Sequence, residues 1–302
     1  MSEKKLKIGL IGLDSSHVVA FTELLHDQNH TYHIPGGEVI VAYSEVSPDF
    51  EMSYSRVEGF TEQVRNRFGV KTVNSLEEVA ETCDAILLES VDGRIHLDQF
   101  RRIAPYGKPT FIDKPFALTS QEAREIADLA HKHGVPLMSC SALRYAESFT
   151  EALLTTEHGP VIGMDCYGPM ALQATQPGVF WYGIHTVEML YRALGSGCVQ
   201  VSAVSNEHHD VITGLWENGT IGTIRGNRQG NSDFGALLHR EKKTQFIDVY
   251  GHPKSYYASL LEQIMSMFVT KKADIELTET LQIVRFLEAA NESRESGRPV
   301  IL

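Results

Sequence analysis

The sequence has few cysteines, no long apolar run and no excess of positive charge. Only Cys83, Cys140, Cys166 and Cys198 occur, with no Cys-x-x-Cys pair, so we expect free thiols rather than a zinc or redox site. No apolar stretch approaches the ~20 residues of a membrane span. The net charge of −12 excludes a nucleic acid or an anionic membrane as the main partner, because both need clustered Lys and Arg. We therefore expect a cytoplasmic protein that binds a small molecule.

The composition is that of an ordinary globular protein. Apolar residues make up 42% and charged residues 22% of the sequence, close to the averages of folded proteins. At 302 residues the chain exceeds the usual size of one hydrophobic core. A change of pattern near residue 142 predicts two domains, residues 1–142 and residues 143–302.

Short apolar runs alternate with helical periodicity in the first domain. The expected strands cover residues 6–13, 38–44, 85–88, 108–112 and 135–141. Helices are expected near 18–25, 57–68, 93–106 and 120–133, with a further short helix that begins after Ser75. Ser75 and Thr119 each precede a glutamate by three positions, which is the spacing of a capping box. This alternation predicts an α/β fold, a Rossmann-like doubly wound parallel sheet with right-handed crossovers.

The second domain has a different pattern. Helices are expected near residues 146–156, 182–194, 256–270 and 278–295, and strands near 161–167, 199–205, 211–216, 220–225 and 244–250. Several of these strands alternate apolar with polar residues and are joined by hairpin-like turns. The pattern predicts an α+β domain with a predominantly antiparallel sheet.

The first strand-to-helix turn reads Gly-Leu-Asp-Ser-Ser-His over residues 12–17. A dinucleotide fold usually carries Gly-x-Gly-x-x-Gly there, so that the backbone approaches a diphosphate. Only Gly12 remains, because Asp14 and His17 occupy the other glycine positions. A carboxylate about 5 Å from a phosphate would cost on the order of 3 kcal/mol, which Ser15, Ser16 and a protonated His17 could offset. Alternatively, Asp14 is the helix N-cap. We predict that these five residues contact the cofactor.

Two further sequence positions fall at strand ends. Glu45 ends the second strand, where an acidic side chain commonly accepts hydrogen bonds from ribose hydroxyls and repels a 2′-phosphate, so NAD is favoured over NADP; the alternative is a solvated loop glutamate. Asp113 and Lys114 follow the strand ending at Ile112, the edge where open α/β sheets bind ligands. An ammonium there can exchange a proton with a substrate oxygen, although a surface lysine is equally compatible with the tripeptide.

The order of these elements resembles that of the Gfo/Idh/MocA oxidoreductase family. That family carries a Glu-Lys-Pro motif at the corresponding strand end, and Asp113-Lys114-Pro115 is similar to it. The resemblance implies that Lys114 is catalytic and that Asp113 and Lys114 lie against the cofactor. Arg144-Tyr145 resembles the basic-aromatic pair after the last strand of the family's first domain. The resemblance therefore implies an NAD-dependent dehydrogenase with a two-domain fold.

The same family carries Asp-x-Gly-x-His at the start of a helix in its second domain. Here the segment reads Trp-Tyr-Gly-Ile-His over residues 181–185, so His185 matches the histidine and Trp181 replaces the aspartate. An indole holds no carboxylate charge but can stack on a sugar or a nicotinamide ring. His185 is then either a proton relay beside Lys114 or a structural residue. The residues expected to meet the substrate are His96, Arg144, Tyr145, Trp181, Tyr182 and His185.

Three functions remain open at this point. The first is an NAD-dependent dehydrogenase that acts on a CH–OH group of a sugar, a polyol or a related small molecule through Lys114 and His185. The second is a ligand-binding or regulatory protein of the same fold that lacks hydride transfer, and the third is a lyase or hydrolase that uses NAD in a transient redox cycle. We find no metal-ligand spacing. In the resembled family the open face of the second domain's sheet is commonly an oligomer contact, so we expect a homodimer or homotetramer.

Overall fold

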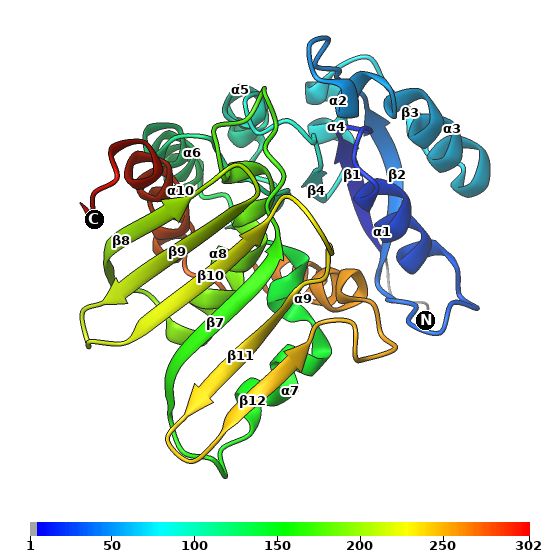
Figure 1. The fold of residues 1–302 in the computed structure, drawn as a ribbon. Helices are drawn as coiled ribbons and strands as arrows, with labels where there is room; N and C mark the ends of the chain where they lie inside the picture. Colours follow the sequence, from blue (N-terminus) through cyan, green and yellow to red (C-terminus); the bar gives the residue numbers. More distant parts are fainter. Residues whose placement is uncertain (1–4) are drawn as a thin grey trace. The chain divides into compact units, whose positions relative to one another are not determined.

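A computed structural model describes residues 5–302, which form two compact units (Figure 1). The first unit contains the chain up to residue 117 together with residues 121–140 and 257–277. The second contains residues 118–120, 141–256 and 278–302. The sequence-based division at residue 142 treats each domain as one continuous segment. The first unit instead also takes in a segment that lies more than a hundred residues beyond that boundary.

The first unit has the predicted parallel sheet, with six strands rather than the five expected, because the two-residue strand at Lys71–Thr72 was not predicted. Its strands are β1 (Leu6–Ile11), β2 (Gly37–Tyr43), β3 (Lys71–Thr72), β4 (Ala85–Leu88), β5 (Thr110–Ile112) and β6 (Leu137–Met138), in the order β3-β2-β1-β4-β5-β6. From β1 the chain adds β2 and β3 on one side of the sheet, and it then adds β4, β5 and β6 on the other side. Because ligands of such sheets bind at the carboxyl ends of the strands on either side of this reversal, the candidate site lies after β1, β2, β4 and β5.

Helices connect these strands. They are α1 (His17–His26), α2 (Glu51–Tyr54), α3 (Val57–Phe68), α4 (Leu76–Thr82), α5 (His96–Ile103) with the 3₁₀ turn η1 (Ala104–Tyr106), α6 (Ser120–His133) and, from the end of the chain, α9 (Tyr256–Thr270). The predicted cap of α4 is present, since the Ser75 hydroxyl accepts from the Glu78 N–H at 3.2 Å. The helix predicted from residue 93 begins only at His96, because Asp92 holds the preceding residues in a turn through the Arg94 N–H.

The second unit has a seven-stranded sheet. Its strands are β7 (Val161–Pro169), β8 (Cys198–Ser205), β9 (His209–Trp216), β10 (Ile221–Asn227), β11 (Gly235–Arg240), β12 (Thr244–Asp248) and β13 (Val300–Ile301), in the order β12-β11-β7-β10-β9-β8-β13. Every pairing is antiparallel except that between β7 and β10. Its other elements are the 3₁₀ turn η2 (Ala142–Tyr145) and the helices α7 (Glu147–Leu154), α8 (Phe180–Leu194) and α10 (Leu277–Ser296). The predicted α+β architecture is therefore confirmed.

Strand β11 was not predicted, because its sequence lacks a clean alternation of apolar and polar residues. Arg240 stands at a buried position, where its guanidinium donates to the backbone carbonyls of Ala152, Leu153 and Gly159 at 2.8–3.0 Å. These carbonyls belong to the end of α7 and the loop after it. A buried arginine that satisfies backbone acceptors looks like a surface residue in the sequence, so the strand pattern is hidden.

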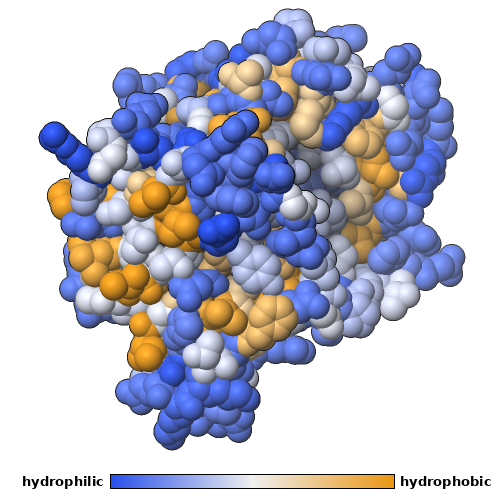
Figure 2. Space-filling model, viewed as in Figure 1, coloured by the Kyte–Doolittle hydropathy of each residue, from blue (hydrophilic) through white to orange (hydrophobic). Residues whose placement is uncertain are grey.

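One face of this sheet packs against helices and the other is open. Residues of α8 contact β7 and β10, and Figure 1 shows the sheet in front of α8 and α10. The open face carries exposed apolar side chains, and Figure 2 shows apolar residues gathered over these strands. Register places Phe246 opposite Leu237, and Val204 opposite Val211. The open face therefore exposes apolar side chains with only some polar residues among them.

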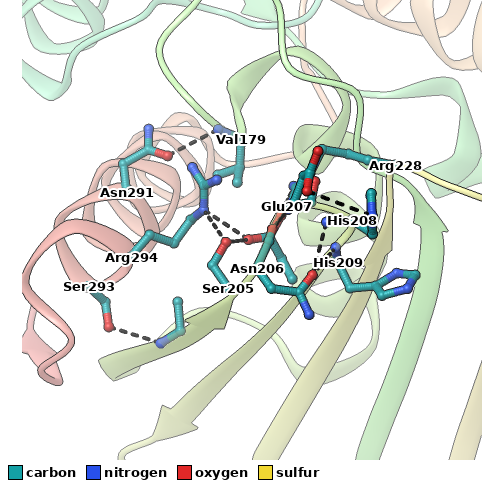
Figure 3. Close-up of polar contacts among 12 residues, drawn as sticks. Val179, Ser205, Asn206, Glu207, His208, His209, Arg228, Asn291, Ser293 and Arg294 are labelled. Atoms are coloured by element: carbon teal, nitrogen blue, oxygen red, sulfur yellow. Dashed lines mark hydrogen bonds and ion pairs between the residues drawn. The ribbon is translucent and has the colours of Figure 1, made fainter.

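A buried carboxylate joins the hairpin of β8 and β9 to α10. Asp210 is fully buried and pairs with Arg228 and, at 2.9 Å, with Arg294. Figure 3 shows Arg294 reaching from α10 to Ser205 at the end of β8, and the Asn206 side chain accepting from the hairpin backbone. Two guanidinium groups compensate the buried charge, which makes this cluster structural.

The four cysteines are buried and free, as expected. Among residues 5–302, no helix combines the length and the hydrophobicity that crossing a membrane requires.

Candidate functional site

The turn between β1 and α1 depends on Gly12. Its φ of +82° is unfavourable for other residues, and a Cβ atom there would lie 2.3 Å from the backbone nitrogen of Ser90. The glycine thus allows the turn to pack directly against the end of β4. This fulfils one requirement of a dinucleotide turn, the close approach of backbone.

Asp14 is not the helix N-cap, so that alternative is wrong. Residue Ser16 occupies the N-cap position and makes no side-chain capping bond. The Asp14 carboxylate instead accepts from the Ser53 hydroxyl at 2.6 Å and from the Val91 N–H at 2.9 Å. It is fully buried, and burial raises its pKa although these hydrogen bonds oppose the shift. Because the carboxylate is used inside the protein, it does not present a charge toward an anion at the turn.

The two serines of the turn differ in exposure. Ser15 is buried and its hydroxyl accepts from the His17 N–H at 3.2 Å, whereas Ser16 is exposed. Within the described part of the chain, the backbone N–H groups of Ser15 and Ser16 have no hydrogen-bond acceptor. Free N–H groups before a helix, with no acidic residue in its first turn, suit an anion.

His17 lies between two buried carboxylates. Its Nδ1 is 3.3 Å from Glu89 Oε2 and 3.2 Å from Asp113 Oδ2. Burial lowers the pKa of His17, but the two carboxylates outweigh it and raise the pKa to about 9. Burial raises the pKa of Glu89, whereas His17 and Lys114 hold that of Asp113 below its usual range despite its burial. His17 is therefore a buried imidazolium at neutral pH.

Neighbouring aromatic rings enclose the His17 imidazolium. The ring stacks on Phe21 at 5.3 Å and meets the edge of Tyr257, from α9, at 4.8 Å. The Nε2 atom makes no hydrogen bond with residues 5–302 and is not fully enclosed, so it can donate outward.

His17, Glu89 and Asp113 also have ligand atoms within 4.8 Å of one another, a spacing a metal ion could use. The ion pairs with a charged His17 already account for this arrangement.

Glu89 was missed by sequence reasoning. It follows β4 directly, so its position at the carboxyl end of a central strand was the available signal. Its Oε1 is buried without a hydrogen-bond partner among the described residues.

Glu45 borders a hollow at the end of β2. The hollow has a volume of about 290 Å³ and is also lined by Ser47, Pro48, Asp92 and Arg94. Glu45 is partly exposed and accepts from the Gln99 amide at 2.9 Å. Arg94 is paired with Asp92 and Asp49, both at 2.7 Å. The hollow therefore offers a carboxylate to hydroxyl groups, and its arginine is already neutralised by two acids.

Lys114 is partly exposed and follows the buried end of β5. Its backbone N–H donates to the Asp113 carboxylate at 2.7 Å, and its ammonium is close enough to lower the pKa of both Glu89 and Asp113. The structure thus brings Lys114 together with the turn residue His17 at one edge of the sheet. This edge belongs entirely to the first unit.

His96 does not have the expected exposure for a substrate contact. It is fully buried, with Nε2 2.7 Å from the Ser90 carbonyl and Nδ1 3.0 Å from the Pro115 carbonyl. Both ring nitrogens are thus used to hold the segment after Lys114 against the end of β4. His96 positions the site rather than facing a ligand.

Arg144 and Tyr145 are also buried, contrary to the role expected for them. The Arg144 guanidinium pairs with Glu188 at 3.2 Å and Glu279 at 2.5 Å, and only 4% of its side chain is exposed. Burial raises the pKa of Glu188 to about 7, although Arg144 opposes the shift. Arg192 lies over the Tyr145 ring at 5.6 Å. These residues form part of the second unit's interior.

The segment that carries His185 forms the first half of α8. Trp181 is 6% exposed, whereas Tyr182 and His185 are partly exposed. The rings of Tyr182 and Phe234 lie 5.9 Å and 5.4 Å from that of His185. His185 Nδ1 is 2.6 Å from the hydroxyl of Ser141, a residue that sequence reasoning did not select. These groups belong to the second unit, and Lys114 belongs to the first.

Residues 6–140 match the family described as "Oxidoreductase family, NAD-binding Rossmann fold", known as Gfo/Idh/MocA. A curated relative, an uncharacterized oxidoreductase of Streptococcus pneumoniae serotype 4, is 26% identical over 125 residues. That match covers 40% of this chain and only 34% of the relative, about a third of its length. The match to the family confirms the resemblance found in the sequence.

Solved structures of similar fold extend over the whole chain. GenD2 from gentamicin A biosynthesis, solved with NAD, has a TM-score of 0.81 at 17% identity, covering 100% of this chain and 97% of its own. Scyllo-inositol dehydrogenase from Lactobacillus casei, solved with NAD(H) and scyllo-inositol, has a TM-score of 0.81 at 15% identity and 99% coverage of both chains. At these identities the similarity demonstrates a shared fold.

Proposed function

We propose that this chain is an NAD-dependent dehydrogenase of a CH–OH group, because residues 6–140 match the oxidoreductase family with an NAD-binding Rossmann fold. The observation that carries the proposal is Lys114, which follows β5 at the carboxyl edge of the sheet and lies beside His17, Glu89 and Asp113. An ammonium at this edge is the proton-exchanging group that such a reaction requires.

The residues present fit a dinucleotide. The Gly12 turn allows close approach of backbone, and the free N–H groups of Ser15 and Ser16 with the outward Nε2–H of His17 would bind the diphosphate. The buried Asp14 carboxylate no longer opposes this. Glu45 and its hollow would accept the adenosine ribose hydroxyls.

NAD is preferred over NADP for an electrostatic reason. Glu45 would repel a 2′-phosphate, and Arg94 is already paired with two carboxylates and offers little compensation. The phosphate would thus enter a hollow whose remaining charge is negative.

A bound NAD would supply the hydride acceptor. As the neutral amine, Lys114 would take the proton from the substrate hydroxyl at its Nζ and become the ammonium, and in the reverse direction the ammonium would return that proton. His185 would hydrogen-bond the same reacting group, and Trp181 and Tyr182 would offer aromatic surface to a sugar or polyol ring. The scyllo-inositol found with the Lactobacillus casei dehydrogenase supports a polyol as substrate class.

We also propose that the chain assembles into a homodimer or homotetramer through the open face of the seven-stranded sheet. Exposed Phe246, Val204 and Ile221, at 66%, 77% and 52%, would be covered in such an assembly. Light scattering at micromolar concentration should give a mass of two or four chains, and the mass of a single chain would contradict this assembly.

The proposal is tested by thermal shift with NAD, NADH, NADP and NADPH. A ligand near 100 times its Kd stabilises by roughly 2.7 kcal/mol, which raises Tm by several degrees. We expect NAD and NADH to raise Tm, and NADP and NADPH to raise it less. The Glu45→Gln variant should narrow this difference, whereas Glu58→Gln, an exposed change on α3, should leave it unchanged.

The outcomes separate the candidate functions. No shift with any dinucleotide would favour a ligand-binding protein without a redox reaction. A larger shift with NADPH than with NADH would contradict the role of Glu45. A shift with NAD followed by product formation without net NADH release would identify the transient redox cycle of a lyase or hydrolase.

A further inference from the structure

His185 has lost the acidic neighbour that the resembled family carries four residues earlier, because Trp181 occupies that position. An indole N–H only donates, so Trp181 cannot orient an imidazole as a carboxylate does. Another group must therefore set the position of the ring proton of His185, and the segment before η2 supplies it.

Ser141 makes the direct contact. Its hydroxyl oxygen is 2.6 Å from His185 Nδ1, and the residue is fully buried. The same oxygen accepts from the Leu143 N–H at 3.2 Å, as the cap of η2. A hydroxyl has a single proton, and the one acceptor that the structure gives it within residues 5–302 is Nδ1 of His185.

This geometry determines the tautomer of neutral His185. If Ser141 donates to Nδ1, that nitrogen carries the lone pair and the ring proton must be on Nε2. The opposite tautomer would give Nδ1–H as donor and leave the buried Ser141 proton without an acceptor, which costs about 1–3 kcal/mol. The Nε2–H form is therefore favoured.

Glu188 lies close to Ser141. It follows His185 by three residues on α8, and its carboxylate accepts from Arg144 at 3.2 Å. Burial raises the pKa of Glu188, and the nearby Ser141 backbone N–H opposes that shift. Arg144 pairs in turn with Glu279 of α10. The Tyr182 and Phe234 rings lie 5.9 Å and 5.4 Å from the His185 ring.

We propose that Ser141, held as the cap of η2, is the positioning residue that replaces the missing aspartate and fixes neutral His185 as an Nε2–H donor toward the substrate oxygen. This inference rests on the proposed function for the role of His185, but not for its tautomer. In this role His185 donates a hydrogen bond to the substrate without accepting a proton.

The test measures the tautomer directly. The ¹⁵N shifts of the His185 ring, assigned by comparison with His185→Gln, should show Nε2–H in the wild-type protein at alkaline pH, where the ring is neutral. Ser141→Ala should give a mixture of tautomers, and Ser141→Thr, which keeps the hydroxyl, should restore Nε2–H. Ser139→Ala is the matched control, because it removes another buried hydroxyl two residues away.

Kinetics provides the second measurement. With a substrate found among inositols, sugars and polyols, Ser141→Ala should lower kcat about tenfold while KM changes less than twofold, since one hydrogen bond to a positioning group is lost. An Nδ1–H ring in the wild type, or an unchanged tautomer in Ser141→Ala, would overturn the inference. If no substrate turns over, the dehydrogenase proposal fails while the ring shifts still decide the role of Ser141.

Discussion

Replacing Lys114 with alanine should lower kcat by about 10²- to 10⁴-fold, the usual contribution of a positioned acid–base group. The Lys114 ammonium lies close enough to the buried carboxylates of Glu89 and Asp113 to lower the pKa of both, so the free energy of unfolding should also fall, but by less than in a variant that lacks the His17 cation between them. The measurement is steady-state NADH formation at saturating NAD and polyol, together with urea denaturation. The same change at Lys132, an exposed residue of α6, should leave both quantities unaltered.

The result also discriminates between loss of chemistry and loss of binding. The Tm shift produced by NAD should persist in Lys114→Ala if the turn and Glu45 hold most of the cofactor. A variant with wild-type kcat would remove Lys114 from the mechanism. A variant that loses the Tm shift together with activity would make Lys114 a cofactor ligand instead.

Replacing His17 with glutamine should lower the free energy of unfolding by about 3 kcal/mol at pH 7, because two buried carboxylates lose the cation between them. Glutamine retains most of the volume without the charge. Glu89 can take up a proton in the variant, since burial already raises its pKa. The loss of unfolding free energy should therefore lie at the lower end of the range usual for broken buried ion pairs. Urea denaturation measures the change, and His131→Gln on the exposed end of α6 is the control.

The pH dependence gives a separate signature of the His17 imidazolium. Its pKa rises from 6.5 to about 9 on folding, so its stabilisation is fully present below pH 6.5 and disappears as the pH rises through 9. The wild-type protein should therefore lose unfolding free energy across this window, and His17→Gln should show a flatter profile. Parallel profiles for the two proteins would mean that His17 is neutral in the folded state.

Much of the first unit follows from local patterns. The strand at residues 85–88 and the N-cap at Ser75 were predicted from the sequence and are present. Lys114 was placed at a strand end from the apolar run before it, and β5 ends directly before Asp113. Such features depend on neighbours a few residues away, so a single sequence contains them.

The polar residues of the site were harder to predict. Asp14 was expected to contact the cofactor or to cap a helix, and His96 and Arg144 to contact the substrate, yet all three are buried in internal hydrogen bonds or ion pairs. Glu89 and Ser141 were not expected at all. Their partners His17 and His185 lie 72 and 44 positions away in the chain. No spacing rule connects residues so far apart.

By itself, the sequence determined most of the strands and helices, the Gly12 turn and the lysine at the end of β5, because backbone conformation and hydrophobic periodicity are local properties. Only the tertiary structure decided which polar side chains turn inward. The fold places His17 between two buried carboxylates, which keep its ring protonated, and places the Ser141 hydroxyl beside His185. Desolvation and pairing depend on groups that folding brings together from distant parts of the chain.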